Sequence, residues 1–233
     1  MCTVTFLPLK NNNFILTSNR DETPLRETLP PKEYLENGIK MVFPKDKLAG
    51  GTWIGTSSKN RLVCVLNGAF IKHTRKTNYK KSRGLIAKEI LQTTNFQEYI
   101  KDLELEGIEP FTMVIVDWNE NNLNLFELIW DENQKRFNRL QNEPKIWSSA
   151  TLYSDEIKAL RKKWFKNWIK KNDFNSSNIL QFHHSEIGDK EQAVFMKRPF
   201  VETVSITSIK KENKTIEMLY EDVIHSKKLL LTI

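Results

Sequence analysis

Cysteine, glycine and proline are scarce in this chain, and no segment has the character of a membrane span. Two of the 233 residues are cysteine, Cys2 and Cys64, too few for a disulfide framework, which favours a reducing compartment. The eight glycines and eight prolines form no repeat, linker or low-complexity segment. No apolar run approaches the ~18 residues of a membrane helix, and the first residues lack a secretory leader. We therefore expect a cytoplasmic protein without stable membrane insertion.

Histidine is also rare, and its distribution does not suggest a metal site. Of the four histidines, His73 and His225 stand apart, and the pair His183-His184 adjoins Glu186 without a second pair of ligands at metal-binding spacing. Adjacent histidines usually point to opposite sides, so we expect polar residues at a helix end. The sequence predicts no metal and no cofactor.

The chain is basic, with a formal net charge of +7. The densest basic run holds one aromatic residue, Tyr79, and no nucleic-acid-binding motif accompanies it, so a solvated face is expected rather than a nucleic-acid interface. The run could also rim a pocket and attract an anionic acyl substrate. It comprises Lys72, Arg75, Lys76, Lys80, Lys81 and Arg83.

Hydrophobic patterning predicts an α+β protein. With 39% apolar residues, the chain is able to bury a sizeable core, and we expect one domain over residues 1–233. Strands are predicted at 3–10, 14–18, 52–57, 61–67, 111–118, 123–130, 137–140, 201–209, 215–220 and 228–233, and helices at 83–93, 96–105 and 154–171. The long helix carries a predicted core stripe of Ile157, Leu160, Trp164, Trp168 and Ile169. Residues 23–47 are predicted to form a loop rich in proline and charge, and Cys64 to be a buried structural thiol.

Cys2 is the most informative residue, because removal of Met1 would leave a thiol and a free α-amine on one residue. An α-amine titrates near ~8 and a thiol near ~8.5, so the amine could accept the thiol proton at neutral pH. Aminopeptidase removal of Met1 is expected, since the following side chain is small. The alternative is that Cys2 is an ordinary residue at the start of a strand.

The polar run Ser18 to Glu22 follows the second predicted strand. A hairpin turning at Asn11 to Asn13 would return this run to the start of the chain. A guanidinium from Arg20 would favour a thiolate, and a carboxylate from Asp21 would orient the α-amine. The alternative is a solvated turn.

Three motifs in order resemble one known family. They are Met1-Cys2, the string Asn19-Arg20-Asp21-Glu22, and Gly50-Gly51-Thr52-Trp53-Ile54-Gly55. Together they are similar to the NRDE family, which includes the transport-and-Golgi-organisation type 2 proteins. The resemblance is densest over residues 1–70. That family in turn resembles N-terminal nucleophile hydrolases of the choloylglycine hydrolase and penicillin V acylase type, which implies a four-layer αββα sandwich of two mainly antiparallel sheets between helical layers.

The resemblance also implies roles for individual residues. Asn67, at the end of the strand 62–66, would donate to an oxyanion, although an asparagine is equally suited to a turn. Arg198 matches a C-terminal arginine that similar hydrolases bring to the nucleophile, with a surface arginine as the alternative. Ser149 occupies a place where the family pattern has asparagine, a departure that would alter the pocket. Ser149 and the motif residues Asn19 and Trp53 are expected to contact substrate.

Two functions from different classes remain open. The first is an N-terminal cysteine hydrolase that cleaves a non-peptide C–N amide bond of a small acyl-amide through an acyl-enzyme on Cys2. Its predicted catalytic residues are Cys2, Arg20, Asp21, Asn67 and Arg198. The second is a non-catalytic lipid or haem carrier, because members of the family have been linked to lipid and haem handling and a cysteine thiolate is able to ligate haem iron.

Overall fold

The computed structural model describes residues 3–233, which divide into two compact units. Unit 1 joins the N-terminal segment up to Leu25 to residues Glu143–Ile233, and unit 2 is the continuous segment Arg26–Asn142. Cys2 lies outside the described residues. The prediction of a single domain over residues 1–233 stays a prediction.

Unit 1 contains a six-stranded antiparallel sheet with the order β10-β1-β2-β11-β12-β13. The N-terminal hairpin therefore lies within the sheet and is flanked by strands from much later in the chain, β10 on one side and β11 on the other. The strands are β1 (Thr3–Pro8), β2 (Phe14–Glu22), β10 (Lys145–Ser148), β11 (Glu202–Glu212), β12 (Thr215–Asp222) and β13 (Lys227–Thr232).

The predicted hairpin of β1 and β2 is confirmed. Its register runs from Thr3 opposite Asn19 to Pro8 opposite Phe14. Asn11 and Asn12 have φ values of 59° and 55°, the left-handed conformation that asparagine tolerates in tight turns. β2 is longer than predicted, however, and the polar run that follows Ser18 lies inside the strand, where Asn19, Arg20 and Asp21 are buried rather than in a solvated turn.

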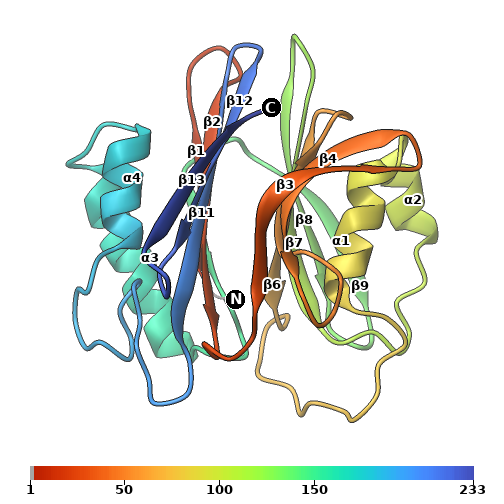
Figure 1. Ribbon diagram of the computed structural model, residues 1–233. Coiled ribbons are helices and arrows are strands. Elements are labelled where there is room, and N and C mark those ends of the chain that lie inside the picture. The colour runs from red at the N-terminus through yellow and green to blue at the C-terminus, as the bar shows by residue number, and fades with distance from the viewer. Residues whose placement is uncertain (1–2) are drawn as a thin grey trace. The chain divides into compact units, whose positions relative to one another are not determined.

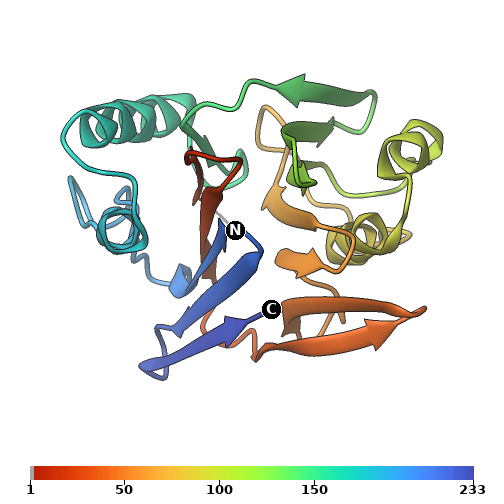
Figure 2. The same ribbon diagram turned by 90° about the horizontal axis from the view of Figure 1, so that it is seen from above.

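Helices α3 (Asp155–Ile169) and α4 (Ser176–His183) lie along one face of this sheet (Figures 1 and 2). Ser154 caps α3 by accepting a hydrogen bond from the backbone N–H of Ile157, which satisfies one of the free donors of the first turn. The core between these helices and the sheet consists of Leu7, Ile15, Ile146, Phe165, Ile179, Phe182 and Val194.

Unit 2 contains a seven-stranded antiparallel sheet with the order β3-β4-β5-β6-β7-β8-β9. Every neighbouring pair is also consecutive in sequence, so the sheet is a simple meander. The strands are β3 (Thr28–Glu36), β4 (Ile39–Asp46), β5 (Ile54–Ser57), β6 (Arg61–Asn67), β7 (Phe111–Trp118), β8 (Leu123–Trp130) and β9 (Lys135–Leu140). Helices α1 (Arg83–Gln92) and α2 (Phe96–Asp102) lie on one side of it (Figure 1).

Helix α1 is capped at its N-terminus and fixed to the sheet at its C-terminus. Ser82 caps its N-terminus, as predicted, by accepting from the N–H of Leu85. At the C-terminus the buried Arg61 side chain of β6 donates to the carbonyl oxygens of Ile90 and Thr93 at 2.8 and 2.5 Å. A cation at this end also complements the helix dipole.

The prediction of a loop over residues 23–47 is wrong, because most of that segment forms the hairpin of β3 and β4. Asn37 and Gly38, with φ values of 51° and 75°, make a two-residue turn of the type that Asn-Gly favours. Pro30 and Pro31 are accommodated because β3 is an edge strand whose register shifts between Leu29 and Lys32. A proline without an N–H is tolerated at such a position.

The structure differs from the sequence predictions at two further points and agrees with them at a third. The core stripe of α3 includes Arg161 and Phe165, whereas Leu160 is 39% exposed. Strand β10 and helix α4 were not predicted, since each is short and weakly patterned. The thiol of Cys64 is fully buried, as expected.

Candidate active site

The candidate residues of unit 1 gather around the strand that begins immediately after Cys2. Thr3, the residue bonded to Cys2, pairs with Asn19 on one side and with Ser148 on the other. Arg20 and Asp21 follow Asn19, and Ser149 follows Ser148. The antiparallel sheet therefore brings Thr3 and Ser148, which are 145 residues apart in sequence, together at the same end of β1.

Asn19 ties β2 to the helical layer. Its Nδ2 donates to the carbonyl oxygens of His183 and Val194 at 3.0 and 2.8 Å, and its Oδ1 lies 2.6 Å from Nδ1 of His183. Because both amide hydrogens go to carbonyls, Oδ1 is the acceptor and Nδ1 of His183 carries the proton. The other ring nitrogen, Nε2, then accepts from the hydroxyl of Thr5 at 2.7 Å.

His183 is held in the neutral form. Its side chain is fully buried, and burial, reinforced by the charges of His184 and Arg161, lowers its pKa to about 3. Desolvation disfavours the imidazolium ion. The expectation of a polar residue at a helix end is correct for His184, whose Nε2 lies 2.6 Å from Oε2 of Glu221, whereas His183 is a core residue.

Arg20 and Asp21 are both 2% exposed. Successive side chains of a strand point to opposite faces, and Asn19 and Asp21 both contact the helix-covered face of the sheet, so Arg20 projects to the other face. Two adjacent ionisable side chains are thus buried on either side of one strand. Charged residues are rarely buried to this extent without a specific role.

Two hydroxyl groups hold the carboxylate of Asp21. The Tyr153 hydroxyl donates to Oδ2 and the Thr203 hydroxyl donates to Oδ1, each at 2.7 Å. Thr203 lies opposite Asp21 in β11, where the register shifts between Thr203 and Ser205. Such β-bulges redirect side chains and are common beside active sites. Each carboxylate oxygen of Asp21 therefore has a fixed direction.

Arg198 belongs to the same neighbourhood. Its guanidinium carbon lies 5.4 Å from the ring centroid of Tyr153, and its nitrogens donate to the carbonyl oxygens of Glu191 and Leu152 at 2.9 and 3.1 Å. The structure thus brings Arg198 next to the tyrosine that contacts Asp21.

Ser149 is 1% exposed, and its hydroxyl lies 3.0 Å from that of Thr151. The carbonyl of Ser149 accepts from the N–H of Tyr153 at 3.2 Å. This turn between β10 and α3 sets the position of the tyrosine.

The remaining two candidates, Trp53 and Asn67, lie in unit 2. Asn67 is the last residue of β6 and is partly exposed, and Gly68 follows it with a φ of 79°. The side chain of Trp53 is 2% exposed, and its carbonyl accepts from the N–H of Val65 at 2.7 Å. A cavity of about 310 Å³ lies along the segment Ala69 to Ile71 that comes next in the chain.

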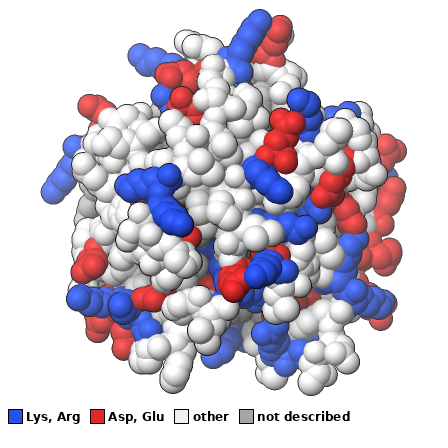
Figure 3. Space-filling model, viewed as in Figure 1, with Lys and Arg blue, Asp and Glu red and all other residues white. Residues whose placement is uncertain are grey.

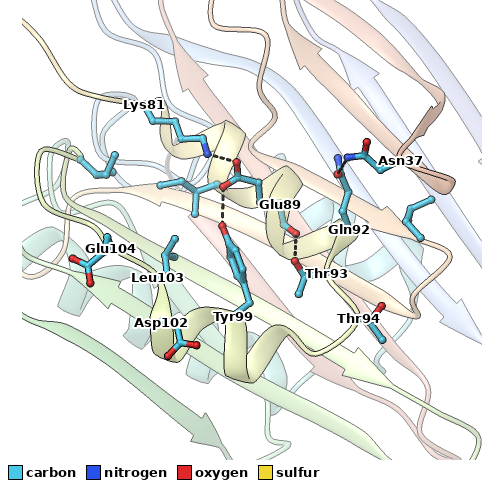
Figure 4. A pocket seen from close by; sticks show the side chains of 13 residues that line it. Asn37, Lys81, Glu89, Gln92, Thr93, Thr94, Tyr99, Asp102, Leu103 and Glu104 are labelled. Carbon is cyan, nitrogen blue, oxygen red and sulfur yellow. Dashed lines mark hydrogen bonds and ion pairs between the residues drawn. The ribbon is translucent and has the colours of Figure 1, made fainter.

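A larger cavity, of about 850 Å³, lies along α1 and α2 in unit 2 (Figure 4). At its centre the carboxylate of Glu89 accepts from the Tyr99 hydroxyl at 2.8 Å and from the amine of Lys81. Burial and the bond to Glu89 raise the pKa of Tyr99. Lys81 of the basic run lines this cavity, but none of the predicted catalytic or substrate-contacting residues does.

The basic run is partly neutralised. Lys76, Lys81 and Arg83 form ion pairs with Glu132, Glu89 and Glu109. Figure 3 shows basic and acidic side chains interspersed on the face in view. Among residues 3–233 no group of His, Cys, Asp or Glu side chains is placed to hold a metal ion. No helix in that range is long and apolar enough to cross a membrane.

The fold is that of the N-terminal nucleophile hydrolases, and the predicted αββα fold class is confirmed. Among solved structures, the N-acylethanolamine-hydrolyzing acid amidase (NAAA) ortholog of Caenorhabditis elegans matches with a TM-score of 0.62 at 12% identity, covering 89% of this chain and 92% of the other. The penicillin V acylase of Agrobacterium tumefaciens matches with a TM-score of 0.59 at 12% identity, covering 100% and 86%. A variant of conjugated bile acid hydrolase from Clostridium perfringens matches with a TM-score of 0.60 at 10% identity, covering 99% and 92%.

The chain belongs to the Transport and Golgi organisation 2 family, whose model matches residues 1–225. The family resemblance drawn from the three motifs is thereby confirmed. No protein of curated function matches the sequence at a significant level.

Three residues around Asp21 were not identified from the sequence. Tyr153 and Thr203 lack any local pattern that marks them, and they reach Asp21 only through the tertiary fold. Arg161 had a detectable signal, because it interrupts the apolar stripe of α3 at a core-facing position and is fully buried.

Proposed function

We propose that the protein is an N-terminal cysteine hydrolase that cleaves a C–N amide bond of a small acyl-amide. The observation that supports this most strongly is the pairing of Thr3, next to Cys2, with the strand that buries Arg20 and Asp21. Arg20 and Asp21 are buried charges in the strand that pairs with Thr3. Buried charges of this kind contribute little to stability by themselves, so a role at the neighbouring Cys2 accounts for them better. The fold and the family membership are consistent with this proposal.

The proposed mechanism starts with removal of Met1. The α-amine of Cys2 accepts the thiol proton, and the thiolate attacks the amide carbonyl to give a tetrahedral oxyanion. The proton passes to the leaving amine as the C–N bond breaks, which leaves a thioester on Cys2. Water then adds to the thioester, and the carboxylic acid leaves with regeneration of the thiol.

The other candidate residues have supporting roles in this proposal. Asp21 orients the α-amine, and Arg20 favours the thiolate. Asn67 is the proposed oxyanion donor, in keeping with its position at the end of a strand. The remaining candidates keep the roles that the family resemblance implies. Arg198 acts near the nucleophile, and substrate is contacted by Asn19, Trp53 and Ser149. Ser149 offers a hydroxyl where the family pattern has an amide.

The first test compares the wild-type protein with the Cys2→Ala variant. The intact mass of protein purified from cells shows whether Met1 has been removed, and a panel of N-acyl amides is then assayed for release of the free amine. We expect loss of Met1 and a turnover that Cys2→Ala abolishes while its melting temperature is unchanged. Turnover that survives in Cys2→Ala would refute the assignment of the nucleophile.

A second variant separates oxyanion stabilisation from nucleophile activation. Asn67→Ala should lower turnover by about 100-fold, the usual cost of one oxyanion donor. Alkylation of Cys2 by iodoacetamide needs no oxyanion and should proceed at the wild-type rate. Retention of Met1, together with slow alkylation, would instead favour the non-catalytic lipid or haem carrier.

A further inference from the structure

Arg161 is a buried cation without a carboxylate partner among the described residues. Its side chain in α3 is fully buried, and its guanidinium donates to the carbonyl oxygens of Gln192 and Ala193 and to the hydroxyl of Thr3. Neutral oxygens alone compensate poorly for the removal of a full charge from water. Another source of stabilisation is therefore expected nearby.

That source is the face of Tyr153. The guanidinium carbon of Arg161 lies 3.6 Å from the centroid of the Tyr153 ring, the distance of a close cation–π contact. The ring is 2% exposed, so water screens this contact only weakly. The hydroxyl of the same ring donates to Oδ2 of Asp21. One phenol thus lies between a buried cation and a buried carboxylate.

We propose that Arg161 and Tyr153 act together as positioning residues for Asp21. A cation on the ring face withdraws electron density from the phenol oxygen, which makes the hydroxyl a stronger donor to the carboxylate. Tyr153 and Thr203 then fix both oxygens of Asp21 in the orientation that holds the α-amine of Cys2. This inference rests on the proposed function, in which Asp21 orients that amine.

The bond from Arg161 to the hydroxyl of Thr3 adds a second connection to the site. Thr3 is covalently bonded to Cys2, so the same guanidinium fixes the first described residue of β1 and polarises the tyrosine that orients Asp21. A displacement of Arg161 would therefore affect the backbone beside the nucleophile and the carboxylate together.

The alternative is that Tyr153 serves only as packing for α3. Tyr153→Phe separates the two roles, because it keeps the ring for Arg161 and removes only the hydroxyl. A packing role predicts wild-type behaviour for the phenylalanine variant. A positioning role predicts a change in the reactivity of Cys2. Tyr99→Phe is a matched control, since it removes a tyrosine hydroxyl from a carboxylate, Glu89, in unit 2.

The experiment measures the rate of Cys2 alkylation by iodoacetamide in the full-length, Met1-processed protein from pH 5 to pH 9. Intact and peptide masses assign the label to Cys2, with the buried Cys64 as an internal standard for unfolding. In Tyr153→Phe we expect the rate at pH 7 to fall at least about fivefold, as for loss of a hydrogen bond to a charged group. The midpoint of the profile should move upward by about half a pH unit, toward the ~8.5 of an ordinary thiol, because the amine is less well placed to accept the proton.

The outcomes distinguish this inference from the proposed function. Fast wild-type alkylation with superimposable profiles for wild type and Tyr153→Phe would overturn the positioning role alone. Slow alkylation of Met1-processed wild type would overturn the proposed function and this inference with it. An equal loss in Tyr99→Phe would show a non-specific effect and would also overturn the inference. If Tyr153→Phe does not fold, Arg161→Met replaces it, because methionine removes the positive charge, and a wild-type profile in that variant would refute the polarising role of Arg161.

Discussion

Asn19 is the residue whose contribution to stability is most clearly defined. It is fully buried and makes hydrogen bonds to two carbonyl oxygens and to the ring of His183. Asn19→Ala would leave these three groups buried without partners. Because each unsatisfied group costs about 1 to 3 kcal/mol, we expect the free energy of unfolding to fall by at least about 3 kcal/mol in urea titrations.

Asn138→Ala is the matched control for this prediction. Asn138 is an exposed residue of β9, and an exposed substitution of this kind changes stability by no more than about 0.5 kcal/mol. If the two alanine variants unfold at similar urea concentrations, Asn19 does not have the structural role inferred from its contacts.

His183 should make the stability of the protein depend on pH. Burial lowers its pKa from the ordinary 6.5 to about 3, so between these values the unfolded chain binds a proton that the native state does not. Stability is therefore fully retained above about pH 6.5 and falls as the pH drops toward about 3, with a limiting slope of about 1.4 kcal/mol per pH unit. Urea titrations from pH 7 to pH 4 measure this slope.

The variant His183→Gln isolates the contribution of the imidazole from that of the carboxylates, which titrate in part of the same range. It should be less stable than wild type at pH 7, because glutamine reproduces the hydrogen bonds of the imidazole imperfectly. The slope of its free energy of unfolding against pH should be smaller than that of wild type by up to about 1.4 kcal/mol per pH unit, the value for one proton. Equal slopes in the two proteins would show that His183 does not remain neutral.

At the scale of elements, the motif Gly50-Gly51-Thr52-Trp53 joins a loop to the first turn of α1. A Cβ atom on Gly51 would lie 2.6 Å from the carbonyl carbon of Gly84, and the N–H of Thr52 donates to the carbonyl oxygen of Gly84 at 3.3 Å. Two glycines are thus required for the backbones to approach this closely. The motif has a packing function that its resemblance to a family does not reveal.

We therefore expect Gly51→Ala to lower the free energy of unfolding by about 2 to 3 kcal/mol, the cost of overpacking against backbone that is unable to move aside. Gly38→Ala provides the comparison. Gly38 has a φ of 75° and no atom near its Cβ position, so only the left-handed conformation is penalised, by about 1 kcal/mol. Thermal or urea unfolding of both variants measures the difference, and a Gly51→Ala protein as stable as Gly38→Ala would contradict the close approach.

Local patterns explain which elements the sequence predicts well. The hairpins β1-β2, β5-β6 and β7-β8 combine alternating apolar residues with short polar turns, and all three pairings are confirmed. The hairpin β3-β4 carries an equally strong signal in Asn37-Gly38, but its prolines and charges suggested a loop. Edge strands tolerate proline, so composition alone is a poor guide there.

At the scale of the whole molecule, the site is less predictable than the elements, because its contacts join distant parts of the chain. Asp21 meets Tyr153 and Thr203 across 132 and 182 residues of sequence. A motif indicates that Asp21 has a role, but only the order of strands in unit 1 shows which residues surround it. The same topology requires the N-terminal 25 residues to join a segment that begins at Glu143.

The net charge of +7 gives the last prediction. A positive field raises the local concentration of anions, and salt screens it. Iodoacetate is an anion and iodoacetamide is neutral, yet both alkylate a thiol. If Cys2 is reactive as proposed, we expect the ratio of their rates at Cys2 to fall by at least about threefold between about 20 mM and about 500 mM salt.

Two double variants show whether the basic run or the total charge causes this dependence. Lys72 and Arg75 are exposed and have no ion-pair partner within residues 3–233, and the same holds for Lys214 and Lys227. Replacing either pair by glutamine lowers the net charge equally. The quantity compared is the ratio of iodoacetate to iodoacetamide alkylation rates at low salt. If this ratio falls more in Lys72→Gln/Arg75→Gln than in Lys214→Gln/Lys227→Gln, the positive field that attracts anions to Cys2 comes from the segment that follows Asn67. Equal falls would assign it to net charge alone, and a ratio independent of salt in the wild type would mean that neither attracts an anionic substrate to Cys2.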